Sequence, residues 1–310
     1  ELNVSPNTVS WYAAKLGIKS PHRFTSQLER NLVQDIQNMY RGTVLTSARD
    51  VIPPKELDIY LPDASIAIEI NGTFWHGEMH GKSQSYHLDK TIACADKAIE
   101  LYHFSDNDIT FNYDIVTNII RSALGLNQCI DAKTLNLVCL SDQQQSAFFD
   151  KHHLEGSAPA SVAYGLTTAD GEVVIATAFA ETGHGMQYQI IRIASAFNVT
   201  VVGGTSRLFN YFCCNNTPAS MIAYSDNQFE SGDAYRDLGF TFTRLTPPEY
   251  RYFKRNNSST THSRHDFQLS LLKDKVDTFD PELSEWENMQ ANGYDRIWDC
   301  GYSEWVWTAQ

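Results

Sequence analysis

Hydrophobic and polar residues alternate strictly along two short segments of the chain. Residues 57–61 read Leu-Asp-Ile-Tyr-Leu, and residues 66–71 read Ile-Ala-Ile-Glu-Ile-Asn. A period of two predicts β-strands, and the short separation of the two segments makes them neighbours in one sheet. Because each strand carries one acidic residue among its apolar ones, we expect Asp58 and Glu69 to converge.

Two carboxylates on adjacent strands suit a divalent metal ion. Their hard oxygens, with a backbone carbonyl such as that of Ile70 and with water, match the octahedral shell of Mg²⁺ or Mn²⁺ bound partly through a substrate phosphate. Such an ion stabilises the charge of phosphoryl transfer and activates water. After a tight turn at Gly72, Trp75 and His76 place an aromatic ring and an imidazole beside the carboxylates. His76 is therefore the candidate general base or acid.

These residues together resemble the core of the very-short-patch-repair endonucleases, a branch of the PD-(D/E)xK nucleases with a restriction-endonuclease-like α/β fold. The residues that carry the resemblance are Asp58, Glu69-Ile70-Asn71, Gly72 and Phe74-Trp75-His76. The resemblance implies that Glu29, on the preceding helix, supports the metal shell or its water, and that residues 101–106 form the next core strand and its acidic end. Asn71 stands where a catalytic Lys is usual, as in the branch that uses His, so the proton-transfer partner stays open.

The segment Tyr86-His87-Leu88-Asp89-Lys90, followed by Cys94, extends the resemblance to phage-type homing endonucleases of this group, whose signature is written Glu-Asp-x-His-Asp. The resemblance implies double-stranded DNA as the substrate. It also implies that His87 or Lys90 contacts the scissile phosphate and that Asn71 and Trp75 contact the DNA. Taken singly, an exposed Asp on a strand or a Trp-His pair is an ordinary structural feature, and only their order and spacing favour catalysis.

Length and composition fit an enzyme with two domains. The chain has 310 residues, of which 42% are hydrophobic, and this is enough for a sizeable core in each domain. No apolar run approaches membrane-spanning length, and the six cysteines show no C-x-x-C spacing. We therefore expect free thiols and a cytoplasmic location, in the host cytoplasm if the protein is encoded by a phage.

The formal net charge of −13 is unusual for a protein that binds DNA, because phosphate contacts normally require a basic surface. One basic and aromatic cluster stands out, and it contains Arg251, Lys254, Arg255 and Arg264 interleaved with tyrosines and a phenylalanine. Such a cluster can bind phosphates and stack on bases, and the alternative is a solvated loop around residues 256–259. The acidic surface also leaves room for a basic protein partner.

The pattern predicts three parts along the chain. Residues 1–23 resemble the recognition helix of a helix-turn-helix, although an amphipathic helix that packs on the nuclease explains them equally well. Residues 24–128 form the predicted nuclease domain. A change of composition near residues 127–133 marks the boundary, and residues 133–310 form a second α/β domain.

The second domain resembles the acetyltransferase fold of the GNAT superfamily. Its predicted elements are a helix at 142–152, strands at 161–166, 173–180 and 187–193, an apolar helix at 206–214, and strands at 219–224 and 241–245. The tight turn at Gly203 and Gly204 opens the apolar helix, and in that fold such a turn binds the pyrophosphate of acetyl-CoA. Here the turn lacks the usual basic residue and spaced glycines. The same region also resembles the domain that accompanies such nucleases in phage proteins, where it would recognise DNA or a partner.

The sequence therefore predicts a Mg²⁺-dependent DNA endonuclease, and more narrowly a free-standing phage homing endonuclease. Two alternatives stay open. The second domain could be an N-acyltransferase, or the whole chain could bind DNA or a partner without catalysis.

Overall fold

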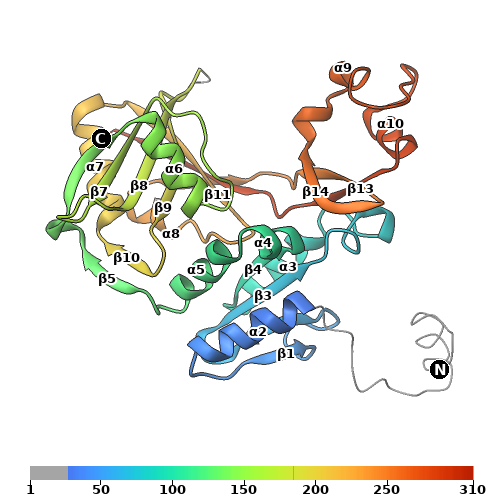
Figure 1. Ribbon diagram of the computed structural model, residues 1–310, viewed down its shortest axis with the longest axis horizontal. Coiled ribbons are helices and arrows are strands. Elements are labelled where there is room, and N and C mark those ends of the chain that lie inside the picture. The colour runs from blue at the N-terminus through green and yellow to red at the C-terminus, as the bar shows by residue number, and fades with distance from the viewer. Residues whose placement is uncertain (1–26, 184, 310) are drawn as a thin grey trace.

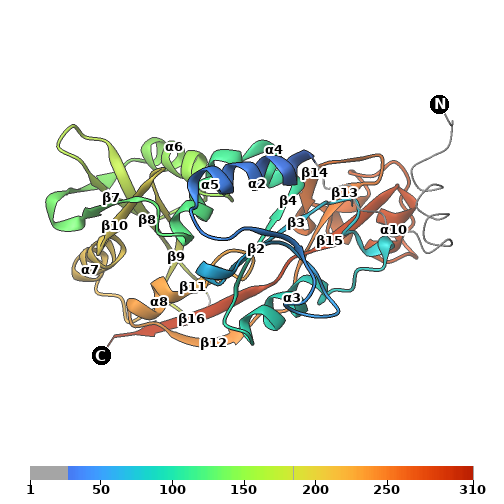
Figure 2. The same ribbon diagram turned by 90° about the horizontal axis from the view of Figure 1, so that it is seen from below.

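The computed structural model describes residues 27–183 and 185–309 and shows a mixed α/β protein (Figures 1 and 2). A first unit, residues 27–126, contains a four-stranded sheet, and a second unit, residues 127–248 and 301–309, contains a seven-stranded sheet. An inserted unit, residues 249–300, interrupts the second unit and lies at the opposite end of the long axis (Figure 1). The helix predicted within residues 1–23 lies outside the described residues.

The first unit consists of four strands and four α-helices, and a helical crossover joins the third strand to the fourth. The strand order is β1-β2-β3-β4, with β3 and β4 parallel and the other neighbours antiparallel. The elements are α2 (Gln27–Met39), β1 (Leu45–Ala48), β2 (Leu57–Leu61), η1 (Pro62–Ala64), β3 (Ile66–Asn71), η2 (Glu78–His80), α3 (Tyr86–Ala95), β4 (Glu100–Ser105), α4 (Asp106–Phe111) and α5 (Tyr113–Ala123). Both alternating segments of the sequence are therefore strands, as predicted.

The two faces of this sheet have different neighbours, and this difference places the charged residues. Ile66 and Ile68 of β3 pack in a cluster with α2 and α5. Ala67, which points the opposite way along the strand, packs in a second cluster with Cys94 of α3. Because side chains alternate along a strand, Glu69 shares the face of Ala67 and is directed toward α3.

The second unit contains most of the predicted strands close to their predicted limits. Its sheet has the order β12-β16-β11-β9-β8-β7-β6, with one parallel pair, β9 and β11. The elements are β5 (Gln128–Asp131), η3 (Ala132–Thr134), β6 (Asn136–Leu140), α6 (Asp142–His152), β7 (Val162–Thr167), β8 (Val173–Glu181), β9 (Tyr188–Ser195), β10 (Val199–Val202), α7 (Gly204–Asn216), β11 (Ser220–Asp226), α8 (Asp233–Asp237), β12 (Thr241–Leu245) and β16 (Tyr302–Thr308). The expected linker is itself a strand, since β5 pairs in parallel with β10.

The inserted unit is a separate small fold that the sequence did not indicate. It contains β13 (Tyr250–Lys254), β14 (Asn257–Ser263), η4 (Arg264–Phe267), α9 (Leu269–Leu272), α10 (Glu285–Ala291) and β15 (Tyr294–Trp298). The sheet order is β14-β13-β15, and Tyr252, Leu272 and Met289 belong to its buried core. The basic and aromatic cluster expected around residues 251–264 is therefore largely the β-hairpin of β13 and β14. Tyr252 of this hairpin packs in the core of the inserted unit.

The first and second units share a packed interface. Leu154 and Phe229 of the second unit pack against the apolar cluster under α2 and α5. The edge strand β4 is also covered there, since the backbone N–H of His103 donates to the carbonyl oxygen of Gln228 at 2.7 Å. The first and second units therefore contact each other through apolar side chains and through the edge of β4.

The described residues contain no helix with the length and apolar character needed to span a membrane. All six cysteines are free thiols, in agreement with the sequence prediction.

Candidate active site

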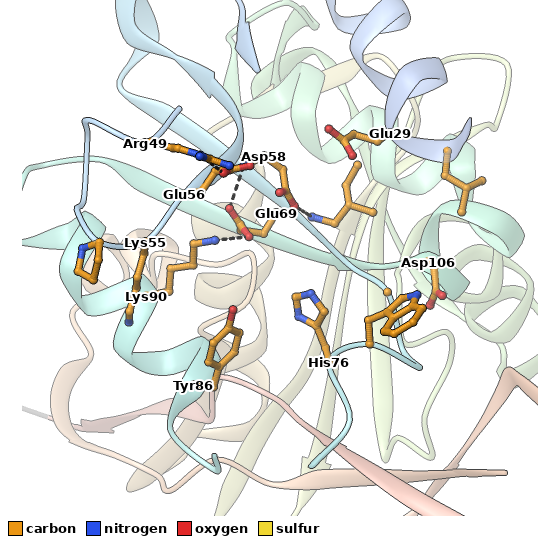
Figure 3. Close-up of a pocket in the computed structure, with 15 residues that line it drawn as sticks. Glu29, Arg49, Lys55, Glu56, Asp58, Glu69, His76, Tyr86, Lys90 and Asp106 are labelled. Carbon is orange, nitrogen blue, oxygen red and sulfur yellow. Dashed lines mark hydrogen bonds and ion pairs between the residues drawn. The ribbon is translucent and has the colours of Figure 1, made fainter. Parts of the chain in front are cut away.

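A cavity of about 860 Å³ opens between α2, the strands β2 and β3, and α3 (Figure 3). It contains five of the six predicted catalytic residues, and the sixth, His87, does not line it. The lining residues are Leu28, Glu29, Arg49, Pro54, Lys55, Glu56, Asp58, Glu69, Ile70, Gly72, Trp75, His76, Tyr86, Lys90 and Asp106. Side chains that are far apart in the sequence therefore face one cavity.

Asp58 and Glu69 converge, as the alternation of the two strands predicts. The backbone N–H of Asp58 donates to Glu69 Oε1 at 3.0 Å, and the backbone N–H of Ile70 donates to Asp58 Oδ2 at 2.9 Å. Each carboxylate therefore accepts a hydrogen bond from the strand that carries the other. This reciprocal pair fixes both side chains against the sheet at the wall of the cavity.

Lys90 of α3 forms a salt bridge with Glu69 Oε2 (Figure 3). Both groups are buried, with side-chain exposures of 8% for Lys90 and 3% for Glu69. Burial and the nearby Asp58 carboxylate raise the pKa of Glu69 to about 8, and Lys90 opposes this shift. Glu69 thus accepts from Asp58 at one oxygen and from Lys90 at the other, and each oxygen keeps a further lone pair with which Glu69 could bind a metal ion.

His76 lies on the segment between β3 and α3 and lines the cavity near Tyr86 (Figure 3). Burial, with the charges of Lys82 and Lys90, lowers the pKa of His76 to about 4. The imidazole is consequently neutral near pH 7 and can accept a proton. A neutral ring has no imidazolium proton to donate, so the lowered pKa favours a base over an acid.

His87 lies behind His76 rather than in the cavity. The two rings are stacked, with centroids 5.1 Å apart and an angle of 14° between planes, and His87 is only 2% exposed. Neither ring nitrogen of His87 has a hydrogen-bond partner among the described residues. His87 therefore supports the His76 ring, and between His87 and Lys90 only Lys90 lines the cavity where a phosphate could bind.

Asp106 is a site residue that the prediction placed only at the acidic end of a strand. Its Oδ1 accepts hydrogen bonds from the backbone N–H of Thr73 at 3.1 Å and from the Thr73 hydroxyl at 2.5 Å. These bonds hold the turn after β3 that precedes Trp75 and His76. The signal that could have identified Asp106 is its place directly after β4, next to the end of β3 in the sheet.

The residues predicted to contact DNA are divided between several places. Trp75 lines the cavity mouth and is 64% exposed, which suits stacking on a base. Asn71 is 5% exposed and its Nδ2 lies 3.2 Å from His103 Nδ1, so its contacts are internal. Arg251 and Arg264 line, with Asn71, a second cavity of about 680 Å³ between the three units.

The other two predicted DNA contacts lie on the exposed surface of the inserted unit. Lys254 ends β13, and Arg255 is in the turn of the hairpin. Arg255 also donates to the carbonyl oxygen of Gln290 at 3.0 Å and contacts the sulfur of Met79, so the hairpin turn reaches the segment that carries Trp75.

The oxygen ligands near Asp58 would suit Mg²⁺, which needs few protein side chains, better than a metal ion bound entirely by side chains. No group of three or more His, Cys, Asp or Glu side chains in the described parts of the chain could bind an ion. Asp58 and Ile70 line the cavity, and Mg²⁺ commonly binds through one or two carboxylates, water and substrate phosphates. A divalent ion at this place would therefore take most of its ligands from water and a substrate phosphate.

The turn at Gly203 and Gly204 does not offer a comparable site. Gly204 packs on apolar side chains, and a Cβ there would lie 2.8 Å from Val201 and 2.9 Å from Ile175. The guanidinium of Arg207, in the first turn of α7, bonds to the carbonyl oxygens of Ala132 and Leu135. The nearest cation is thus turned away from any pyrophosphate at the helix start.

No protein-family model matches this chain, and no curated protein matches its sequence. The chain is similar to a Bacillus subtilis acetyltransferase solved in complex with CoA, with 11% identity over 57% of this chain and 99% of that chain, and a TM-score of 0.32. It is also similar to a protein described as a streptothricin acetyltransferase from Bacillus anthracis, solved with acetyl coenzyme A, with 10% identity, coverage of 57% and 83%, and a TM-score of 0.27. At TM-scores this low, neither likeness bears on the chemistry of this chain.

Proposed function

We propose that the first unit is a Mg²⁺-dependent DNA endonuclease with a PD-(D/E)xK fold, of the kind found in phage homing endonucleases. The observation that carries the proposal is the single cavity lined by Glu29, Asp58, Glu69, His76 and Lys90. The order of strands and helices around it supports the same proposal, because α2, three antiparallel strands, the α3 crossover and parallel β4 position these residues together.

Asp58 and the carbonyl of Ile70 would hold Mg²⁺, which when bound neutralises charge on the scissile phosphate and lowers the pKa of water. Glu69 keeps Asp58 in place through its hydrogen bond to the Asp58 backbone. Glu69 also holds the ammonium of Lys90 at the cavity wall, where it can attract a phosphate oxygen. The charged residues are thus ordered before the substrate binds.

His76 would accept the proton of the attacking water. Its lowered pKa leaves the ring neutral near pH 7, and the stacked His87 would restrict its rotation. Glu29, at the opposite wall, would orient that water or a water of the metal shell (Figure 3). Trp75 would stack on an exposed base, and Arg251, Lys254, Arg255 and Arg264 would contact phosphates farther along the DNA.

The test is cleavage of supercoiled and linear DNA by the purified chain with Mg²⁺, Mn²⁺ or EDTA. Cleavage that needs the metal and is lost in His76→Ala and Asp58→Ala would support the proposal. A matched control is Arg236→Ala, since Arg236 is an exposed residue of the second unit that pairs with Asp233. Cleavage by both site variants at the parent rate would overturn it.

Acyl transfer by the second unit is a second candidate, favoured by one feature of the seven-stranded sheet. The central parallel strands β9 and β11 pair only between Tyr188–Ile190 and Met221–Ala223, so their carboxyl-terminal parts separate. Against it, apolar side chains pack on Gly204, and the guanidinium of Arg207 bonds to backbone carbonyls. A thermal-shift titration with acetyl-CoA decides this point, since stabilisation would favour acyl transfer and its absence would favour the nuclease.

A third candidate, a chain that binds DNA or a basic protein without catalysis, predicts salt-sensitive DNA affinity with no metal-dependent cleavage. The cleavage experiment separates it from the nuclease.

A further inference from the structure

The segment that carries Trp75 and His76 has little structure of its own. Between the end of β3 and the start of α3 it contains only the short η2 turn, Glu78–His80. A few turn hydrogen bonds hold it locally, such as those from the His76 backbone N–H to Gly72 at 2.9 Å and from Gly81 to Glu78 at 2.9 Å. Something outside this segment must therefore fix the position of His76.

Asp106 and His87 of the first unit supply contacts at Thr73 and at the His76 ring, and strand β15 of the inserted unit supplies contacts beyond His76. Glu78 accepts hydrogen bonds from Arg296 Nε at 2.5 Å, Arg296 Nη2 at 3.0 Å and Trp298 Nε1 at 2.9 Å. The next residue, Met79, donates its backbone N–H to the carboxylate of Asp295, at 3.3 and 3.4 Å. We call these contacts the Glu78 clasp. Figures 1 and 2 both show the segment after β3 against the strands of the inserted unit.

The clasp is rigid on the side of the inserted unit. The Arg296 guanidinium lies among three aromatic rings. Its Cζ is 4.4 Å from the ring centroid of Trp286 and 4.8 Å from those of Tyr250 and Trp298, and the side chain is 16% exposed. Asp295 is fully buried. Because the guanidinium stacks between rings, its Nε and Nη2 donors are held in place to form two parallel hydrogen bonds with the Glu78 carboxylate.

The inserted unit also lies close to the backbone of Gly77, the residue that follows His76. A Cβ on Gly77 would lie 2.3 Å from Asp295 Oδ2 and 3.0 Å from the Phe253 ring. The backbone of the segment therefore lies directly on β13 and β15, one residue after the imidazole.

We propose that the inserted unit positions His76 through the Glu78 clasp, so that Glu78 and Arg296 are positioning residues for the reaction in the first unit. This inference rests on the proposed nuclease function. The clasp spans more than two hundred residues of sequence and joins a part of the site that belongs to no strand or α-helix of the first unit. A base that is displaced by about 1 Å can lose about two orders of magnitude in rate.

The experiment compares Arg296→Met and Glu78→Gln with the parent chain. Arg296→Met keeps an apolar side chain among the aromatic rings but removes the donors, and Glu78→Gln keeps one acceptor oxygen. The matched control is Arg236→Met, which removes an exposed Arg that pairs with Asp233 in the second unit. The kinetic readout is cleavage of supercoiled DNA, and the structural readout is hydrogen exchange of the backbone amides in residues 74–82.

For Arg296→Met we expect kcat to fall about 10- to 100-fold with a KM change below about threefold. Exchange in residues 74–82 should become about tenfold faster while the strands of the first unit keep their protection. The kcat and the exchange rate of Glu78→Gln should lie between those of the parent and those of Arg296→Met. The control should match the parent in both readouts.

Unchanged exchange in residues 74–82 in both variants would overturn the clasp, and so would an unchanged kcat in an active protein. The two readouts also separate this inference from the proposed function. If the parent chain does not cleave DNA, the nuclease proposal fails, whereas exchange still decides whether the inserted unit holds the His76 segment.

Discussion

The cavity of the first unit and the turn at Gly203 and Gly204 of the second unit are both places where an α/β protein commonly binds phosphate, yet their surroundings differ. The cavity contains two carboxylates joined by reciprocal backbone hydrogen bonds and a buried ion pair. At the turn, apolar side chains pack on Gly204 and the nearby Arg207 bonds to backbone carbonyls. Burying charge is costly without a function or a partner, so the comparison indicates where chemistry is expected.

The largest expected effect comes from breaking the buried pair with Lys90→Met. The variant leaves Glu69 buried without its cation, and such a loss typically costs about 3–5 kcal/mol. Because Lys90 lowers the pKa of Glu69, its removal raises that pKa further above about 8. Glu69 is then protonated at pH 6 in the parent and the variant alike, and the loss of the cation matters most at high pH, where the parent carries the charged pair.

We therefore expect the free energy of unfolding, measured with denaturant, to fall more in Lys90→Met at pH 9 than at pH 6. The double variant Lys90→Met with Glu69→Leu should recover much of this free energy. Equal stability of Lys90→Met and the parent at pH 9 would show that the pair contributes nothing.

Asp58→Asn sharpens the comparison through activity rather than stability. The amide keeps the acceptor oxygen for the Ile70 N–H but loses the negative charge that a metal ion needs. We expect the cleavage rate at saturating Mg²⁺ to fall about 10²- to 10³-fold, or about 3–4 kcal/mol in activation free energy. A melting temperature equal to that of the parent is the control, and a variant as active as the parent would remove Asp58 from the site.

Acid should destabilise the first unit through its buried histidines. Burial lowers the pKa of His76 to about 4 and that of His103 to about 3. Below the ordinary histidine pKa near 6.5, these side chains bind protons in the unfolded chain but stay neutral in the folded one. The stability that they contribute above pH 6.5 is therefore lost as the pH falls toward 4.

Glu69, whose pKa is raised to about 8, contributes with the opposite sign, so the test is the difference between variants. We expect the free energy of unfolding of His103→Gln to lose less than that of the parent between pH 6.5 and pH 4, by a few kcal/mol. A slope that does not change in His103→Gln would show that other groups cause the acid sensitivity.

The smallest effect is expected at the turn of the second unit. In Gly204→Ala the added methyl group meets Val201 and Ile175, and overpacking of this kind costs about 1–3 kcal/mol. The melting temperature should therefore fall while the DNA cleavage rate per folded molecule stays unchanged. A loss of cleavage without a loss of stability would link this turn to the reaction and break the contrast between the two units.

Local patterns predicted much of the first unit. The alternation in residues 57–61 and 66–71 predicted β2 and β3 and the convergence of Asp58 and Glu69, because side-chain direction in a strand depends on spacing alone. The same reasoning predicted most strands of the second unit. It did not predict that β5 pairs with β10 or that Asn71 bonds internally to His103, because both depend on elements that are distant in the chain.

The sequence by itself determined the strands, the acidic pair and the segment that carries His76, since these follow from periodicity and from residue order. Only the tertiary structure decided that Lys90 neutralises Glu69, that His87 lies behind His76, and that the inserted unit holds Glu78. The physical reason is that packing brings together groups separated by up to 220 residues, such as Glu78 and Trp298, and local spacing carries no information about such pairs.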